Sequence, residues 1–418
     1  MNSDYDKILK LNSLLVAVVV LAPTLSGTLA NGLGVSSGAN LYVIIAIACL
    51  YITKLVREAS SIVKKEWNFT GKTVILLLSV FVLYFVTKFT SGGEHNYSFI
   101  QLLFYAIIPI LVTTMEIKTE YVLRYAVYMS VFTIIGLEGF LEVRWGGYEQ
   151  ADLGKVYSLV TVLTCTVFHF RYYSNKANLL IKLCYLYNGY VFVRVLMVAN
   201  RGAMFALLFT IFVAFIYKFD DNGLMKRQTT KKIVIICITI IISAIVVQNL
   251  GEIIDWAIGV CSDLFGKVPA ALRKMKSYIR AEDISNGRAD INEVVYAGIK
   301  ESPIYGHGLN MFYPYTNKEY IYPHNFILQY LFEGGILFAT LPILYSIGAL
   351  IKVILGRVEQ KEQFVFAAML VCQCFPKLLL STNVWFVTAI WMLIIYSAND
   401  LFIDKAKRTG CICDNDYM

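Results

Sequence analysis

Three side chains with distinct chemistry stand out in a strongly apolar chain: His324, Arg288 and Arg201. His324 belongs to the triplet "PHN" at 323–325, directly before a long apolar run, and the chain has only four histidines. A free imidazole has a pKa of about 6.5, which suits a general base at neutral pH. Guanidinium groups stay charged and bind phosphate through paired hydrogen bonds. Each residue also has a structural reading: a helix cap for His324, a solvated arginine for Arg288, and a charge that snorkels to the membrane surface for Arg201.

The elements that must position these residues are membrane helices. The chain has 418 residues, of which 58% are hydrophobic and only 16% charged, far from the composition of a soluble protein. A bilayer core is crossed by about 20 apolar residues. Twelve runs approach that length, so we expect an all-α polytopic membrane protein with about twelve spans. They are 11–30, 38–53, 73–90, 98–115, 121–141, 154–170, 178–198, 203–217, 233–250, 325–351, 363–380 and 383–399.

The basic residues predict the orientation of these spans. Most of the 37 Lys and Arg residues fall in loops that share one side of the membrane if the N-terminus is inside. Because cytoplasmic loops are enriched in Lys and Arg, both termini are predicted to be cytoplasmic. The net charge of +8 is then an orientation signal, and its dispersal over many loops speaks against nucleic-acid binding.

The predicted organisation has four parts. Residues 1–250 hold spans one to nine, 251–323 form a large extracytoplasmic loop, 324–400 hold spans ten to twelve, and 401–418 form a cytoplasmic tail. The long loop contains two sequences with helical periodicity, at 252–268 and 285–303. In the second, Ser285 or Asn286 is the expected cap and Pro303 the expected stop. Its apolar stripe is Ile291, Val294, Val295, Gly298 and Ile299.

Two long stretches and one short one resemble the O-antigen ligase and polymerase superfamily of bacterial envelope glycosyltransferases. They are "NGRADINEVVYAGIKESPIYGHGLNMFYPY" at 286–315, "YPHNFILQYLFEGGILF" at 322–338 and "ANRGAMFALLF" at 199–209. The matching features are a GR-type start, an SP-x-x-G-x-G turn, a PHN close and an Arg-Gly pair opening a span. His307 stands where the family usually has an aromatic residue, and Asn286 replaces a Ser or Thr.

The resemblance implies a GT-C-like fold and transfer of a glycan from a polyisoprenyl diphosphate carrier to an acceptor hydroxyl. The reaction would occur on the outer face of the bacterial cytoplasmic membrane, between lipid-linked donor and acceptor oligosaccharides. A flippase and a chain-length regulator are the implied partners. Arg288 and Arg201 would then stabilise the diphosphate, and His324 would take the hydroxyl proton or bind phosphate or sugar. We expect no metal and no cofactor, since no His-Glu-x-x-His or phosphate-cradling loop occurs.

Further residues are candidates for substrate binding or remain unexplained. Lys377, inside span eleven, is a buried charge without an identifiable partner, and Gly334 with Gly335 would let span ten approach a neighbouring helix. The predicted substrate-binding residues are Asn325, Arg194, Tyr322, Tyr315 and Glu142, the last also an alternative base.

Three functions are compatible with the sequence. A repeat-unit polymerase is preferred because short loops and no added acceptor domain suit a second lipid-linked substrate. A ligase of the same superfamily would use a different acceptor. A flippase or transporter should show paired halves or discontinuous helices around a midplane site, and neither pattern is found in the sequence.

Overall fold

The structure is a computed structural model of the full chain. It describes 3–35, 38–60, 69–91, 97–141, 153–198, 201–220, 222–226, 249–266, 288–358, 360–380, 382–399 and 401, with short pieces between 268 and 277. Within these ranges the chain is helical and has no strand, only two isolated bridges. The predicted all-α class is therefore confirmed for the part of the chain that is described.

The helices of the first half are α1 (Ser3–Val20), α2 (Ala22–Leu33), α3 (Ala39–Ala59), α4 (Gly71–Thr90), α5 (Phe99–Leu102), α6 (Ile108–Thr113), α7 (Thr119–Met129), α8 (Leu137–Phe140), α9 (Leu153–Tyr173) and α10 (Leu179–Val198). Those of the second half are α11 (Arg201–Ile216), α13 (Leu250–Phe265), α15 (Arg288–Glu301), α16 (Phe312–Tyr315), α17 (Phe326–Ile354), α18 (Lys361–Leu380) and α19 (Thr388–Ala398). A π-helical turn, Leu103–Ile107, joins α5 to α6, and a 3-10 segment, Ser130–Gly136, joins α7 to α8.

Six helical stretches are long and apolar enough to cross a membrane, or seven if one bent pair counts as a span. Their outward sides are apolar, as lipid contact requires: Val82 of α4 is 59% exposed and Leu186 of α10 is 73% exposed. The six are Ala39–Ala59, Gly71–Thr90, Thr119–Phe140, Leu179–Leu196, Phe326–Ile354 and Lys361–Leu379. A multi-pass membrane protein is confirmed, and the count of twelve spans stays a prediction.

The other expected spans differ from simple crossing helices. The first is bent by 59° between α1 and α2, where Pro23 at the start of α2 cannot continue the hydrogen bonding of α1. Three are shorter apolar helices, Phe99–Thr113, Gly202–Ile216 and Thr388–Ala398. The expected span 154–170 is α9, which is not among the six, and 233–250 falls almost wholly outside the described residues.

The core is built around α18 and α19. Every residue of α19 is buried, and α19 packs against α6, α17 and α18, while α18 also packs against α9 and α11. A helix enclosed in this way need not span the bilayer, because its surroundings are protein and its backbone bonds are internal. At the centre the rings of Trp385 and Trp391 stack with centroids 5.1 Å apart, and the Tyr330 ring packs edge-on against both.

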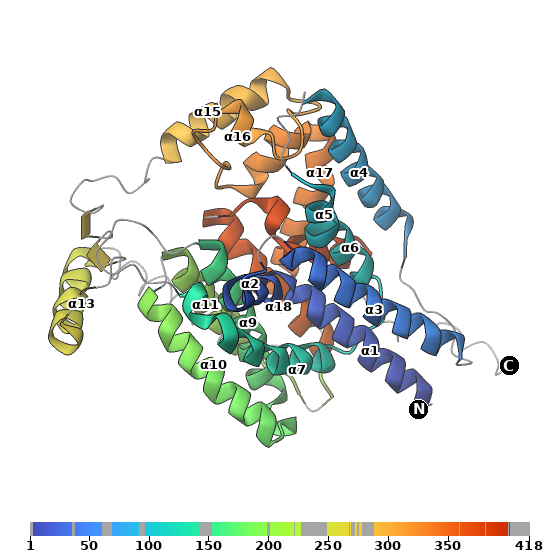
Figure 1. The fold of residues 1–418 in the computed structure, drawn as a ribbon, viewed down its shortest axis with the longest axis vertical. Helices are drawn as coiled ribbons and strands as arrows, with labels where there is room; N and C mark the ends of the chain where they lie inside the picture. The colour runs from blue at the N-terminus through green and yellow to red at the C-terminus, as the bar shows by residue number, and fades with distance from the viewer. Residues whose placement is uncertain are drawn as a thin grey trace.

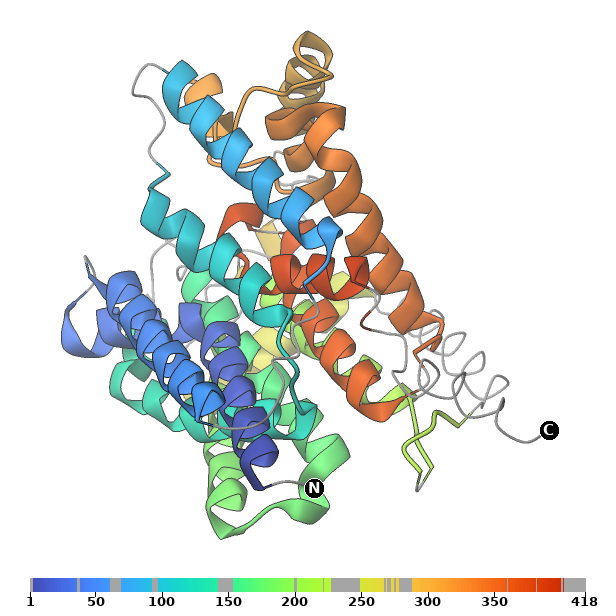
Figure 2. The ribbon, with the colours of Figure 1, turned by 90° about the vertical axis from the view of Figure 1, so that its right-hand side faces the viewer.

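The two predicted helices of the long loop are present but lie apart (Figure 1). Helix α13 lies on the flank beyond α10, and Gly266 ends it in the left-handed conformation at φ 64°. Helix α15 packs on α17 at one end of the molecule, close to α16 and α4. Figure 2 shows that α1 begins at the other end, far from α15 and α16.

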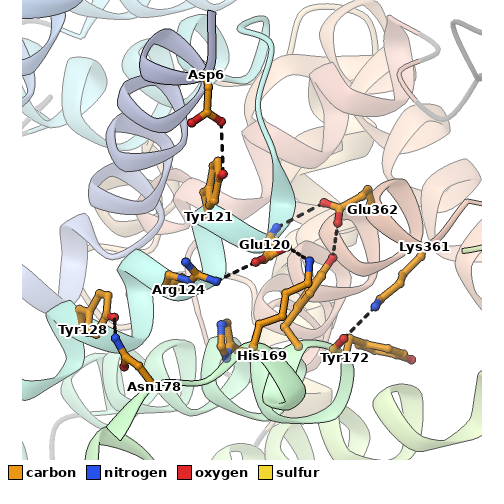
Figure 3. A network of polar contacts seen from close by, with 12 residues as sticks. Asp6, Glu120, Tyr121, Arg124, Tyr128, His169, Tyr172, Asn178, Lys361 and Glu362 are labelled. Carbon is orange, nitrogen blue, oxygen red and sulfur yellow. Dashed lines mark hydrogen bonds and ion pairs between the residues drawn. The ribbon is translucent and has the colours of Figure 1, made fainter. Parts of the chain in front are cut away.

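A buried polar cluster ties helices together at the end where α1 begins (Figure 3). The Glu120 carboxylate, 3% exposed, accepts from Arg124 at 2.7 Å and from Lys176 at 2.6 Å. Glu362 of α18 accepts from the Glu120 amide at 3.3 Å and from the Tyr173 hydroxyl at 2.8 Å. These cations belong to the set that the positive-inside pattern assigns to the cytoplasm, so the predicted inner side and helix α15 lie at opposite ends of the molecule.

Candidate functional site

Helix α17 is interrupted close to the residues of the predicted site. Gly335 has φ 59° and ψ −171°, so the stretch from Phe326 to Gly334 and the stretch from Ile336 to Ile354 are two helices joined at a sharp bend. Residues other than glycine rarely adopt this backbone conformation. Two expectations are corrected: Gly335 allows the helix to break where helix–helix packing was expected, and α17 is a discontinuous helix where the sequence showed none.

The segment 303–308 fills this break. At a helix break the backbone amides and carbonyls lose their helical partners and need new ones. Here the loop supplies both kinds of group, so loop and helix form a single hydrogen-bonded unit. The bonds are Ile336 N to Pro303 O at 2.9 Å, Leu337 N to Ile304 O at 3.2 Å, His307 N to Phe332 O at 2.8 Å and Gly308 N to Glu333 O at 2.8 Å.

The close fit of loop and helix explains two of the glycines in the SP-x-x-G-x-G and E-G-G sequences. A Cβ atom on Gly306 would lie 2.5 Å from the Glu333 carbonyl, and one on Gly335 would lie 2.2 Å from the Ile304 carbonyl oxygen. Both residues also have positive φ. The two sequence motifs therefore encode one contact between segments some thirty residues apart in the chain.

A buried carboxylate lies inside this unit. Glu333, 1% exposed, accepts from the Asn310 amide at 3.0 Å, from Gln329 Nε2 at 2.9 Å and from Trp385 Nε1. All three partners are donors, which is the pattern that an ionised carboxylate satisfies. Within the described residues no Lys or Arg forms an ion pair with it.

Asn383 closes the network around Glu333. Its Oδ1 accepts from Gln329 Nε2 at 2.7 Å and from the Trp385 amide at 2.9 Å, and its Nδ2 donates to Asn310 Oδ1 at 2.8 Å. The turn before α19 is thereby bound to the first part of α17 and to the loop. Sequence reasoning missed this network, although a glutamate within an apolar span is a signal of a buried polar site.

We expect Glu333→Gln to lower the free energy of unfolding by about 2 kcal/mol, because the new amide nitrogen must face a donor. Glu333→Leu should cost about 3 kcal/mol or more, since it removes the acceptor for the Asn310 amide and Trp385 Nε1. Thermal unfolding of the detergent-solubilised protein measures both. The matched control is Glu301→Gln, whose side chain is 59% exposed and should change stability by no more than about 0.5 kcal/mol. An unchanged unfolding temperature for Glu333→Leu would contradict the assigned network.

The "PHN" triplet lies at the start of α17, nine residues before the acid. Asn325 is the N-cap: its Oδ1 accepts from the Ile327 amide at 2.9 Å and from the Leu328 amide at 3.3 Å. Asn325, and not His324, is therefore the cap of this helix, so the structural role considered for His324 belongs to its neighbour. Substrate binding by Asn325 remains a prediction. Its side-chain oxygen already accepts the two amide hydrogen bonds that cap α17.

His324 itself has an unusual backbone. Its φ is 56°, in the left-handed region, and its half-buried ring packs against Tyr322 with centroids 4.4 Å apart. Such a conformation is uncommon outside glycine and persists only where the surroundings impose it. Pro323 before it and the Asn325 cap after it supply that constraint on the backbone.

Helix α15 brings Arg288 toward this turn. Ile291 and Val295 are buried against Leu328 and Phe332 of α17, as the predicted apolar stripe requires. Further along α15, a Cβ on Gly298 would lie 2.3 Å from Phe332, and Asp290 near the start of α15 interacts electrostatically with Tyr320, four residues before His324. Arg288 is the first residue of α15, on the His324 side of these contacts. The Arg288 side chain and the expected caps Ser285 and Asn286 lie outside the described residues.

The remaining predicted site residues are placed in different ways. Arg201 is the first residue of α11, and its side chain lies outside the described part. Arg194 donates to both oxygens of Glu138, at 3.1 and 3.0 Å, and to the Tyr190 hydroxyl at 2.6 Å, so it is already paired. Glu142 lies outside the described residues.

Tyr315 and His307 form an aromatic cluster on α17. The His307 ring stacks on Phe332 at 4.6 Å and packs against Tyr315 at 4.8 Å, with Nε2 2.8 Å from the Gly298 carbonyl. This histidine therefore occupies the aromatic place that the family pattern leads one to expect. The Tyr315 hydroxyl donates to Glu301 at 3.0 Å, and partial burial together with this carboxylate raises the pKa of Tyr315.

The comparisons with known proteins agree with this part of the chain. Residues 187–343 match the family model described as O-antigen ligase. The interval contains α11, α13, α15, α16 and the first part of α17, including the break at Gly335. A comparison with curated proteins finds no match.

Proposed function

Because residues 187–343 match the O-antigen ligase family model, we propose that the chain is a member of the O-antigen ligase and polymerase superfamily and polymerises a cell-surface polysaccharide from lipid-linked repeat units. The family match by itself supports a membrane glycosyltransferase or ligase that acts on lipid-linked oligosaccharides. The narrower proposal is that a growing glycan passes from one polyisoprenyl diphosphate to a sugar hydroxyl on another. The observation that supports it is the "PHN" turn, which lies at the capped start of α17, the helix against which α15 packs.

The proposed step is a substitution at the anomeric carbon of the donor sugar. The acceptor oxygen forms a new bond to this carbon while the bond to the diphosphate breaks, and the lipid diphosphate leaves with the electron pair. The hydroxyl proton goes to His324 or is released to water while His324 holds a substrate oxygen. Arg288 and Arg201 balance the charge that develops on the diphosphate, which a metal ion would otherwise do.

The proposed location is a bacterial plasma membrane with both termini in the cytoplasm. The cation-rich polar cluster and helix α15 of the long loop lie at opposite ends of the molecule, which supports a reaction on the extracytoplasmic face. A flippase that delivers lipid-linked units and a chain-length regulator are proposed partners, because the reaction consumes units made on the other side of the membrane.

We expect the purified protein in lipid bilayers to convert a single lipid-linked repeat unit into a ladder of longer glycans. Gel electrophoresis and mass spectrometry of the lipid-linked products measure this outcome. A chelator should leave the rate unchanged, in line with guanidinium rather than metal stabilisation of the diphosphate.

A ligase is the second candidate, favoured by the description of the matching family model. It would give new glycosidic bonds only after addition of a different acceptor, such as a glycolipid, and no ladder from the repeat unit alone. Lipid-linked units that cross the vesicle membrane without any new glycosidic bond would instead identify a transporter and overturn the proposal.

A further inference from the structure

Lys377 is the one charged side chain between Gln363 and Leu380 of α18, and its surroundings offer no counter-charge among the described residues. In that part of the chain it has no ion pair and no hydrogen bond to a side chain, and its nearest electrostatic neighbour is the Cys374 thiol one turn earlier. Other charges inside the bundle are partnered: Lys54 lies 2.6 Å from Glu58, and Glu120 binds two cations. An unpaired cation in a membrane helix is costly and calls for an anion.

The packing of α11 on α18 locates this charge along the bundle. The two helices run in opposite directions, since the Tyr217 and Phe364 rings pack 4.7 Å apart at one end. Further along, the Thr210 hydroxyl bonds the Cys372 thiol. At about 1.5 Å rise per residue, Lys377 lies about 7.5 Å beyond Cys372. By the same rise, Arg201 at the start of α11 lies about 13.5 Å beyond Thr210 in the same direction. The backbone positions of Lys377 and Arg201 along the bundle therefore differ by about one helical turn.

The start of α17 lies at the same end of α18. Phe375, two residues before Lys377, packs edge-on against Phe326 with centroids 5.6 Å apart. Phe326 follows His324 by two residues. Lys377 is therefore on the end of α18 that adjoins the "PHN" turn, with its side chain half-buried and so partly accessible.

We propose that Lys377 binds a phosphate group of the polyisoprenyl diphosphate carrier. This inference rests on the proposed function and adds a residue outside the motifs that the family resemblance covers. A carrier anchored in the bilayer by its isoprenoid tail presents its diphosphate at the end of the spans, where Lys377 lies. The ammonium is a compact charge that suits phosphate. A phosphate of the carrier would supply the counter-charge that the ammonium lacks among the described residues.

The test compares four proteins in bilayers of zwitterionic lipid: wild type, Lys377→Met, Lys377→Arg and the control Lys88→Met. Lys88 is an exposed cation in the last turn of α4, on the same predicted side of the membrane. Titration with polyisoprenyl diphosphate, followed by ligand-induced thermal stabilisation, gives each Kd. We expect Lys377→Met to weaken binding at least about tenfold, and Lys377→Arg and Lys88→Met to stay within about threefold of wild type.

The unliganded proteins provide a second readout. Removal of an unpaired charge from the helix bundle should raise the unfolding temperature of Lys377→Met above that of the wild type, as expected where a binding site is kept at a cost in stability. If Lys377→Met does not fold, Lys377→Gln, which keeps a polar end without charge, gives the same binding comparison.

The outcomes separate the inference from the function on which it rests. Equal affinity of wild type and Lys377→Met, with polymer formed by both, would overturn the role of Lys377 and leave the function intact. Wild type that neither binds the carrier nor forms glycosidic bonds would overturn both. A parallel titration with phosphatidylglycerol identifies the source of the phosphate: an equal dependence on Lys377 would indicate an ordinary lipid headgroup site and refute the carrier.

Discussion

Replacement of His324 by alanine is expected to slow glycosidic bond formation by about 10²- to 10⁴-fold, the range typical of a lost general base or a lost contact to the reacting group. His324 has a left-handed backbone between Pro323 and the Asn325 cap, and its ring packs against Tyr322. The rate of polymer formation from a lipid-linked repeat unit measures the effect. Because Asn325 and not His324 caps α17, the variant should keep its unfolding temperature.

The matched control is the other histidine of the same region. His307→Phe keeps a ring on Phe332 and beside Tyr315 and removes the bond to the Gly298 carbonyl and the 4.0 Å contact of Nε2 with the Glu301 carboxylate. It should retain activity within about threefold and lose about 1 kcal/mol of stability or less. Full activity of His324→Ala, or an equal loss in both variants, would refute the assignment of His324.

His324→Gln separates the two roles that remain open for the imidazole. A glutamine amide can hold a phosphate or sugar oxygen but cannot take up a proton. If His324 binds substrate, the glutamine variant should keep a substantial part of kcat with a raised KM. If His324 is the base, kcat should fall about as far as in the alanine variant while KM changes little.

Gly335→Ala is expected to lower the free energy of unfolding by about 3 kcal/mol or more, and to abolish activity, because alanine adopts the backbone conformation found here only under strain. In addition, the new methyl group would lie 2.2 Å from the Ile304 carbonyl oxygen. The loop 303–308 must therefore leave the helix break, which exposes the amides of Ile336 and Leu337. Thermal unfolding and hydrogen exchange at these two amides measure the effect.

Gly348→Ala is the control within the same helix. Gly348 is helical, and a Cβ atom added there would meet no other atom within 4 Å, so alanine should stabilise α17 by about 0.5–1 kcal/mol. The pair of variants separates the general effect of alanine in a helix from the specific demand of the break. Equal stability of the two variants would contradict the account of the loop and helix as one unit.

The sequence by itself determined the membrane class, most of the long helices and the order of the functional segments. These properties are local: the length of an apolar run decides whether a helix can cross a bilayer, and the spacing of Ile291 and Val295 decides which face of α15 is buried. The resemblance also predicts His324, Arg288 and Arg201 as site residues, because their neighbours in the chain form recognisable motifs.

Only the tertiary structure decided how these motifs meet. The two glycines of "EGG" read as packing residues in the sequence, yet Gly335 breaks the helix because the carbonyls of Pro303 and Ile304 accept the freed amides. Glu333 accepts hydrogen bonds from donors on separate elements of the chain. Whether a charge such as Lys377 has a counter-charge among the described residues is likewise decided by which elements pack around it. Hydrogen-bond partners and counter-charges are chosen by distance in space, which local hydrophobicity and spacing do not contain.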